Sequence, residues 1–289
     1  MKKETINRHT KIANEIMYYI YKYVDTEINL DELSCDLGVS KFHMHRIFKS
    51  EFGLNIYESI KSIRLQKASS LLLTNKNSTI TQVANMCGYS SHTSFIKAFR
   101  SKFGMTPSHW REEGYKEYIE SILKKSQSAT DSNANFSSLT PNIVKMQEIQ
   151  AYYVRHLGYD KSIKESWQKL QTWTLCNDIN SFIQIGVHHD NPTITPLSEC
   201  NYIACISLQE EFLDASLPMF VIPSGVYARF DFSGEYGDVL KFMNWVYFEW
   251  LVRSGYETTT NPPYAIYHKN HFLVDDGVFN LSYYIPIRL

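Results

Sequence analysis

A six-residue sequence occurs twice in the first part of the chain. FKSEFG occupies residues 48–53 and FRSKFG occupies residues 99–104, with aromatic, basic, serine, charged, aromatic and glycine residues in the same order. The two copies begin 51 residues apart. Because such a match indicates an internal repeat, the chain is expected to build one small structural unit twice.

The repeated six residues end a longer correspondence between two segments. NLDELSCDLGVS begins at Asn29, and TITQVANMCGYS begins at Thr79. Glu32 and Gln82 lie three residues after these starts, which is the spacing of a helix capping box. Each segment is therefore predicted to begin a short helix.

Each of these helices is expected to end at a glycine, Gly38 or Gly88. The turn that follows requires a positive φ, which glycine adopts at little cost. Ser40 and Ser90 come two residues later and are predicted to cap a second helix, which carries the repeated six residues. The unit is therefore predicted to be a helix-turn-helix that is present twice.

An apolar stripe runs through residues 55–73 and predicts a connecting helix about 28 Å long. That length is close to the ~34 Å helical repeat of B-DNA, so the second helices of the two units could enter successive major grooves. In the alternative interpretation, the repeat serves packing alone in a helical bundle of unknown purpose.

The second helices contain both core and surface positions. Phe48, Phe52, Phe99 and Phe103 are assigned to the core, which packing alone would explain. The remaining positions are rich in hydrogen-bond donors and basic groups, which suit contacts to phosphates and base edges. They are Lys41, Phe42, His43, His45, Arg46 and Lys49 in the first helix and Ser91, His92, Thr93, Lys97, Arg100 and Lys102 in the second.

The glycine turns, the phenylalanines of both units and the closing FGMTPSHWR at 103–111 resemble the double helix-turn-helix domain of the AraC/XylS transcription regulators, over about residues 8–113. This resemblance implies double-stranded DNA as a partner, RNA polymerase as a further candidate, and activation more than repression. By position it implies that Phe42, His45, Arg46, His92, Thr93 and Lys97 face bases, whereas Lys41, Lys49, Arg100 and Lys102 are expected to be phosphate contacts or solvated charges. Lys97 stands where the family usually has arginine, so a bidentate contact to guanine is less favoured there.

Beyond residue 141 the pattern changes from helices to short strands. Residues 124–142, rich in serine and asparagine, are predicted to be a linker that cannot order itself by burial. Two strand-and-helix groups about 75 residues apart suggest a second duplication. The predicted strands lie at 149–157, 181–189, 201–208, 225–232 and 280–287, and the predicted helices at 161–175 and 238–252.

The second half holds more aromatic side chains than about 150 residues normally bury, which suggests a cleft for an apolar or aromatic small molecule. Its order of elements, SGYE at 254–257 and YIPI at 284–287 resemble the GyrI-like effector-binding domain. The resemblance implies a pseudo-twofold α+β sheet with a ligand groove between its halves. The expected effector-binding residues are Tyr152, Trp245, Glu249, Tyr267, Ser282 and Tyr284.

Two positions depart from that family pattern. Ser282 and Ala265 stand where many members have an acidic residue, which at the first position meets a cationic ligand. A cation buried among aromatic rings requires a carboxylate or ring faces to replace its hydration. A neutral or weakly polar effector is therefore expected, unless another carboxylate supplies the charge; the candidates are Glu148, Asp231, Glu235 and Glu249.

Composition sets further limits. Residues 1–125 hold 19 lysines and arginines against 13 acidic residues, and residues 126–289 hold 10 against 17. A basic first half is consistent with binding a polyanion, although chance clustering explains the asymmetry equally well. The sequence lacks an 18-residue apolar run, a secretion signal and a CxxC pair. We therefore expect a cytoplasmic protein with reduced cysteines, without membrane contact, metal or cofactor.

The resulting prediction is a multidomain protein, with an all-α DNA-binding domain at 1–113, a helix end and linker at 114–141, and an α+β GyrI-like domain at 142–289. The favoured function is a sequence-specific transcription regulator with a small-molecule effector. A protein-interaction or dimerisation role for the second half is the alternative. A hydrolase is disfavoured, because Ser282 and Ala265 remove carboxylates and because His188 and His189, adjacent on a strand, point to opposite faces.

Overall fold

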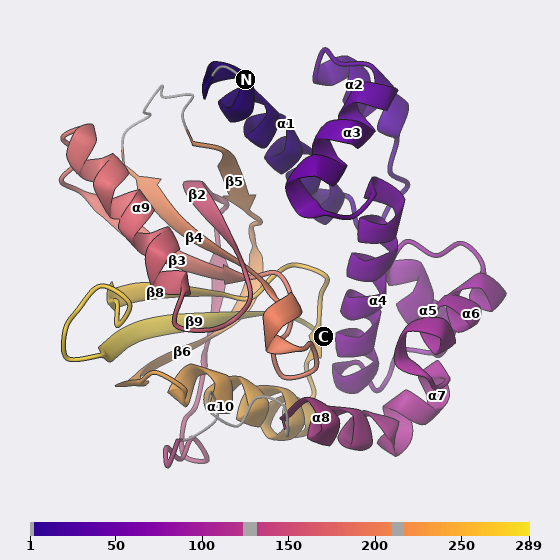
Figure 1. Ribbon diagram of the computed structural model, residues 1–289. Helices are drawn as coiled ribbons and strands as arrows, with labels where there is room; N and C mark the ends of the chain where they lie inside the picture. The colour runs from indigo at the N-terminus through magenta and orange to yellow at the C-terminus, as the bar shows by residue number, and fades with distance from the viewer. Residues whose placement is uncertain (1–2, 124–131, 210–216) are drawn as a thin grey trace.

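The structure of this chain, a computed structural model, describes residues 3–123, 132–209 and 217–289. A helical half and a sheet half lie side by side, and α4 runs next to the sheet half (Figure 1). The helical half contains α1 (Lys3–Lys22), α2 (Leu30–Asp36), α3 (Lys41–Phe52), α4 (Ile56–Thr74), α5 (Ile80–Met86), α6 (His92–Phe103), α7 (Pro107–His109), a π-helical turn (Trp110–Gly114) and α8 (Tyr115–Leu123).

The two helix-turn-helix units are α2 with α3 and α5 with α6. Both second helices have 12 residues and end at a glycine with a φ of 74°. Ser40 Oγ accepts a hydrogen bond from the backbone N of His43 at 3.2 Å, as predicted. The cap of α6 is Ser91, whose Oγ accepts from the backbone N of Ser94 at 3.3 Å. The prediction of Ser90 is therefore wrong, because the turn after α5 is one residue longer than the turn after α2.

The first helices of the two units are also capped at the predicted residues. Asn29 Oδ1 accepts from the backbone N atoms of Asp31 and Glu32 at 3.1 and 3.2 Å. At α5, Thr79 and Gln82 form the complete reciprocal capping box. The caps satisfy backbone N–H groups that have no partner within a helix, so both helix starts are fixed locally by the sequence.

The turn after α5 requires glycine for two reasons. Gly88 has a φ of +72°, and a Cβ there would lie 2.6 Å from Nη2 of Arg64 and 2.7 Å from the carbonyl O of Val24. Arg64, on α4, donates from Nε to the carbonyl of Val24 at 3.0 Å and from Nη2 to that of Thr26 at 2.6 Å. One arginine therefore holds the end of α1 close to the turn of the second unit.

Each unit has a core of its own. Phe48 and Phe99 are fully buried at matching positions, and Phe103 is buried as well. Phe52, the last residue of α3, is only half-buried, so its assignment to the core is confirmed in part. Trp110, also fully buried, donates from Nε1 to a backbone carbonyl of α4 at 3.0 Å, which closes the second core.

The sheet half is antiparallel with the strand order β1-β6-β9-β8-β3-β4-β2-β5, and β7 pairs with β9 outside this path. The order β2, α9, β3, β4 is repeated by β6, α10, β8, β9, and the two groups meet where β3 pairs with β8. This arrangement is the predicted pseudo-twofold sheet. The strands are β1 (Asn142–Met146), β2 (Ile149–Leu157), β3 (Phe182–His188), β4 (Asn201–Leu208), β5 (Met219–Ile222), β6 (Gly225–Glu235), β7 (Glu257–Thr258), β8 (Tyr264–Lys269) and β9 (Val278–Arg288).

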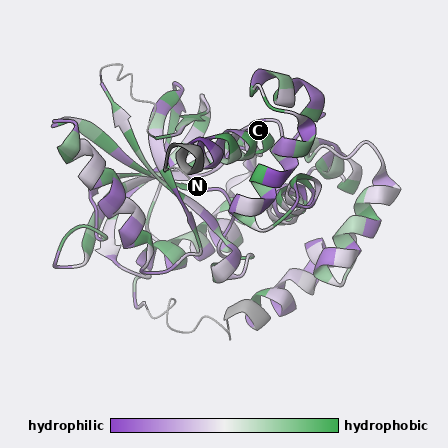
Figure 2. Ribbon diagram, turned by 45° about the horizontal axis from the view of Figure 1, so that its top comes forward, coloured by the Kyte–Doolittle hydropathy of each residue, from purple (hydrophilic) through white to green (hydrophobic). Residues whose placement is uncertain are grey.

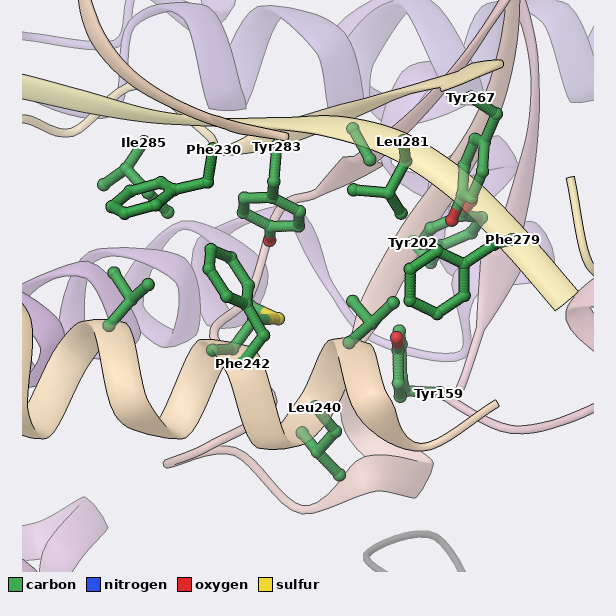
Figure 3. Close-up of a cluster of buried hydrophobic side chains, with 14 of the residues drawn as sticks. Tyr159, Tyr202, Phe230, Leu240, Phe242, Tyr267, Phe279, Leu281, Tyr283 and Ile285 are labelled. Carbon is green, nitrogen blue, oxygen red and sulfur yellow. The ribbon is translucent and has the colours of Figure 1, made fainter. Parts of the chain in front are cut away.

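Helices α9 (Ile163–Cys176) and α10 (Asp238–Trp245) cover one face of the curled sheet. The chain continues from α10 through a π-helical turn (Val246–Trp250) into α11 (Leu251–Ser254). Figure 3 shows Leu240 and Phe242 of α10 below the sheet, with Tyr283 and Leu281 of β9 pointing toward the helix. The rings of Phe242 and Tyr283 lie 5.4 Å apart. This layer is the larger core of the sheet half.

The opposite face of the sheet carries a second apolar cluster. Tyr264 and Tyr284 stack there with ring centroids 4.6 Å apart, and Tyr18 of α1 packs against the same cluster. The helices in Figure 2 carry both hydrophobic and hydrophilic residues, as expected when one side of each helix is buried. The helical half therefore contributes directly to covering the sheet.

The predicted linker is partly packed. Residues 124–131 of it lie outside the described residues. Phe136 is buried in the core of the sheet half, with its ring 5.4 Å from that of Phe242. Lys241 donates from Nζ to the carbonyl of Ser132 at 2.7 Å. The expectation that this stretch cannot order itself by burial is therefore wrong for residues 132–141, because one phenylalanine and polar contacts to α10 are sufficient.

All five cysteines are free, with Cys87, Cys200 and Cys205 buried and Cys35 and Cys176 exposed. Within the described ranges, none of the helices combines the length and the apolar character that crossing a membrane requires.

Candidate functional site

The outer surface of α3 presents an aromatic and a basic group together. Phe42 is 78% exposed. Large apolar side chains at the surface often mark interaction sites when they belong to a patch. Arg46 and Lys49 are exposed on the following turns, and His45 is half-buried with its ring 5.6 Å from that of Tyr57. Phe42, Arg46 and Lys49 follow the spacing i, i+4, i+7 and therefore share one helical face.

The outer surface of α6 repeats this arrangement. Thr93, Lys97 and Arg100 are exposed at the same spacing, and each follows its counterpart in α3 by 51 residues. Ser91 and His92 are exposed at the start of the helix. The structure thus brings Phe42, Arg46 and Lys49 onto one exposed face of α3 and Thr93, Lys97 and Arg100 onto one exposed face of α6, whereas His45 is half-buried and Ser91 caps the start of α6.

Lys102 does not belong to this surface. Its Nζ donates to Ser62 Oγ at 2.7 Å and to the carbonyl O of Ser62 at 3.3 Å. Burial lowers the pKa of this lysine. The prediction that Lys102 is a phosphate contact or a solvated charge is therefore wrong, and its role is to hold α6 against α4.

Two polar contacts organise the basic face of α3. Lys41 forms an ion pair with Asp31 of α2 at 2.7 Å, and this hydrogen bond raises the pKa of the lysine. Arg46 Nη2 donates to Nδ1 of His43 at 2.9 Å. Burial and the neighbouring arginine lower the pKa of His43, which favours the neutral ring that accepts this bond. Both cations are therefore oriented before any ligand is present.

The six predicted effector-binding residues do not share one cleft. Tyr152 and Tyr267 are buried in the core beneath α9, where the ring of Tyr267 lies 5.6 Å from that of Trp167. Ser282 and Tyr284 alternate with Tyr283 along β9 and therefore face the other side of the sheet.

The remaining two predicted residues, Trp245 and Glu249, line one cleft of about 560 Å³ together with Phe136 and Phe248. Trp245 is half-buried and Glu249 is exposed. Phe248 stacks on Tyr115 of α8, with ring centroids 5.8 Å apart and an interplanar angle of 1°. Phe248, which lines this aromatic cleft, also packs against the core of the second helix-turn-helix unit.

Ser282 has an acidic neighbour that only the strand register reveals. Its Oγ donates to Oδ1 of Asp231 at 2.5 Å and is hydrogen-bonded to Nε2 of His268 at 2.9 Å. Arg229 donates to both carboxylate oxygens of Asp231, which lowers the pKa of the carboxyl group. The negative charge of this carboxylate is therefore already balanced by Arg229. The serine bonds the aspartate directly, whereas in a catalytic triad the histidine lies between them.

The contact between the two halves contains a polar latch. Glu257 of β7 accepts from the backbone N and the Oγ of Ser78 at 3.1 and 2.9 Å, and from Nη2 of Arg288 at 2.8 Å. Burial would raise the pKa of Glu257, but these hydrogen bonds lower it below its ordinary value. Asn75 and Thr258 exchange two further bonds, Nδ2 to carbonyl O at 3.0 Å and backbone N to Oδ1 at 2.9 Å. Of these residues, only Glu257 belongs to a quoted sequence motif, SGYE at 254–257.

A buried loop after β3 forms the other part of this contact. His188 Nδ1 lies 3.1 Å from the hydroxyl of Tyr283, whereas the ring of His189 stacks on Tyr21 of α1 at 3.8 Å. These partners confirm that the two histidines point to opposite sides. Burial lowers the pKa of His188 to about 3 and places that of His189 well below its ordinary value. Farther along the loop, Ile194 inserts into the core of the second helix-turn-helix unit.

Comparisons with known proteins agree with the division into two halves. Residues 139–288 match the family model described as GyrI-like small molecule binding domain, and residues 33–113 match a helix-turn-helix domain. Over 109 residues the chain is 32% identical to PqrA of Proteus vulgaris, named as a probable transcription factor, covering 36% of this chain and 88% of PqrA.

Over 111 residues the chain is 31% identical to the Msm operon regulatory protein of Streptococcus mutans, covering 38% of this chain and 40% of that protein. The chain thus spans less than half of this longer relative. The cryo-EM structure of the EcmrR–DNA complex in EcmrR-RPo matches with 14% identity and a TM-score of 0.43, covering 90% of this chain and 98% of that one.

Proposed function

Because the chain belongs to the AraC/XylS family of transcription regulators and carries a GyrI-like small-molecule binding domain, we propose that it is a one-component regulator. Its helical half binds a specific duplex site, and its sheet half binds a small effector. Activation, with RNA polymerase as partner, is the direction that the family favours.

One observation carries this proposal: the two exposed faces have the same architecture and different side chains. Phe42, Arg46 and Lys49 of α3 correspond to Thr93, Lys97 and Arg100 of α6. Packing would require equal cores, but it does not require two exposed faces rich in donors. An asymmetric site that spans two major-groove turns fits such a pair of faces.

The effector is proposed to be neutral or weakly polar and to bind beside Trp245 and Phe248. These rings, with Phe136, offer an apolar surface, and Glu249 at the rim is the nearest carboxylate of the predicted set. Asp231 is already paired with Arg229 and so offers no free charge to a cation. Titration calorimetry with neutral aromatic probes and with cationic dyes tests this assignment. Preferential dye binding that disappears in Glu249→Gln would reverse it.

Selection of binding sites from random duplexes tests the DNA-binding function. The selected site should be asymmetric, and the affinity should fall steeply as the salt concentration rises. Arg46→Ala should lose discrimination at one base pair by about 1–3 kcal/mol. Lys49→Ala should weaken binding to all sequences alike. Enrichment of no duplex at low salt would refute the function, and equal effects of the two variants would refute the assignment of their roles.

A further inference from the structure

A cleft of about 780 Å³ lies between the two halves of the molecule. Its helical wall comes from α1, the end of α3 and α4, and its other wall comes mainly from β2. Leu54 and Leu157 are 50% and 67% exposed and line it from opposite halves. The volume is in the range of small-molecule sites, and such sites occur preferentially between domains.

Arg155 of β2 lines this cleft with a charge that has no acidic partner. Its Nε donates to Oδ1 of Asn14 at 3.3 Å, but its Nη1 and Nη2 atoms are buried and have no hydrogen-bond partner in the described part of the chain. Across residues 3–123, 132–209 and 217–289, the ion pairs within 4.0 Å do not include Arg155. Arg155 as a whole is half-buried, but its two Nη atoms are fully buried, and leaving them without acceptors is costly because four N–H donors lose water without compensation.

Aromatic rings surround the guanidinium. Its central carbon lies 5.9 Å from the ring centroids of Tyr21 and Phe52 and 5.5 Å from that of Tyr153. Ring faces attract a cation, but they leave the in-plane N–H donors unsatisfied. A carboxylate satisfies such donors in pairs, with a geometry that matches the guanidinium fork.

The rest of the cleft determines what must be attached to that carboxylate. Met17, Leu54 and Leu157 provide apolar surface, while Glu51, Glu199 and Lys169 are the other charged groups that line it. Glu51 is bonded to Thr10 at 3.2 Å. A ligand with one anionic group and an apolar body fits Arg155 and the leucines, whereas a cation placed beside Arg155 would meet a positive charge that has no acidic partner.

We propose that this cleft is a second ligand site, which binds a small amphipathic carboxylate with its anionic group on Arg155 and its apolar part against Leu54 and Leu157. The site is separate from the cleft at Trp245. The carboxylate reaches the Nη atoms by displacing the ring of Phe52, which is the final residue of α3. Occupation of the site is thereby transmitted to the first helix-turn-helix unit.

Calorimetric titration of the full chain with octanoate tests this proposal without DNA, so its failure is distinguishable from failure of the proposed DNA-binding function. Octanoate should bind at least about tenfold more tightly than octanamide, which has the same shape without the charge. Arg155→Gln should reduce octanoate affinity to the octanamide level, and Arg155→Lys should retain part of it. Equal binding of the two probes, or no octanoate binding, would overturn the proposal.

Two further variants separate binding from folding. Arg229→Gln removes a guanidinium of the same sheet that is fully paired with Asp231, and it should leave octanoate affinity unchanged. Leu157→Asp removes part of the apolar contact for both probes and adds a negative charge, so it should weaken octanoate several-fold more than octanamide. If Leu157→Asp weakens both probes equally or neither, or if Arg229→Gln weakens octanoate as Arg155→Gln does, the carboxylate is not bound in this cleft.

Discussion

In the first helix-turn-helix unit, α3 ends at Phe52 beside an open cleft, whereas Ile194 of the sheet half completes the core of the second unit. The polar latch formed by Ser78 and Glu257 lies directly before α5, whereas the segment before α2 has, among the described hydrogen bonds, the longer and exposed contact of Thr260 Oγ1 to Asp25 at 3.5 Å. The repeat therefore specifies two similar local structures, which make different contacts with the sheet half. One unit borders a ligand-sized space, and the other is fixed to the sheet.

If both proposed sites are occupied as described, this difference gives the two units separate routes of communication with the sheet half. The proposed ligand at Arg155 would meet the first unit through Phe52. The proposed effector beside Trp245 would meet the core of the second unit through Phe248. A ligand shifts an equilibrium only by its differential affinity for two states. Each route therefore requires that its helix-turn-helix unit can dock against the sheet half in two different arrangements.

The largest expected effect comes from removing one matched core residue at a time. Phe48→Ala and Phe99→Ala each delete a fully buried ring and should cost about 3–5 kcal/mol of unfolding free energy. All five tryptophans lie outside the first unit. In Phe48→Ala, the unfolding transition followed by circular dichroism should therefore begin at a lower denaturant concentration than the transition followed by fluorescence. In Phe99→Ala, both transitions should move to lower denaturant concentration together. Coincident transitions in both variants would show that the two units are equally coupled to the sheet half.

Acid should weaken the contact made by the buried loop. The pKa of His188 is lowered to about 3 and that of His189 is also depressed, so below pH 6.5 only the unfolded state gains these protons. The stability that the neutral histidines contribute should be fully present above pH 6.5. As the pH decreases below this value, the free energy of unfolding should fall by up to about 1.4 kcal/mol per pH unit for each histidine. Asp190, whose pKa is raised by burial, opposes this trend at lower pH.

The variant His189→Phe isolates this contribution because it retains a ring against Tyr21 without a titrating group. Unfolding by urea at several pH values should give a shallower pH dependence for the variant than for the wild type. Parallel curves would mean that His189 is accessible to protons in the folded state.

How far the sequence alone predicted this molecule depended on the distance between interacting residues. The caps at Asn29 and Thr79 and the turn at Gly88 follow from neighbours within a few positions, so the repeat revealed them. The alignment of the two copies predicts Ser90 in place of Ser91, because it does not reveal the one extra turn residue.

Contacts between distant segments left no such pattern. Lys102 resembles any other basic surface residue until Ser62 of α4 is placed beneath it. Asp231 becomes the neighbour of Ser282 only through the register of β6 and β9. The unpaired charge of Arg155 depends on two halves meeting, and neither half reveals it by itself.

A smaller effect tests whether the latch belongs to the second unit alone. Glu257→Gln loses the charge that binds Arg288 and Ser78 and should cost about 1–3 kcal/mol. Hydrogen exchange should accelerate in the amides of α5 and not in those of α2. Because the pKa of Glu257 is lowered, the wild type should lose this contribution as the pH falls through that value, and the variant should not. Equal acceleration in both helices would assign the latch to the whole helical half.

The smallest expected effect concerns the serine caps of α3 and α6, in which the two units are alike. Ser40→Ala and Ser91→Ala each remove a cap of nearly the same length, 3.2 and 3.3 Å, and each should cost about 1 kcal/mol. Ser90→Ala removes a side chain that caps neither helix and should cost much less. Urea unfolding of the three variants measures these differences. Because a cap acts within a single helical turn, the two cap variants should agree even though the surroundings of the units differ. A markedly larger loss for Ser91→Ala would show that docking against the sheet half also controls the start of α6.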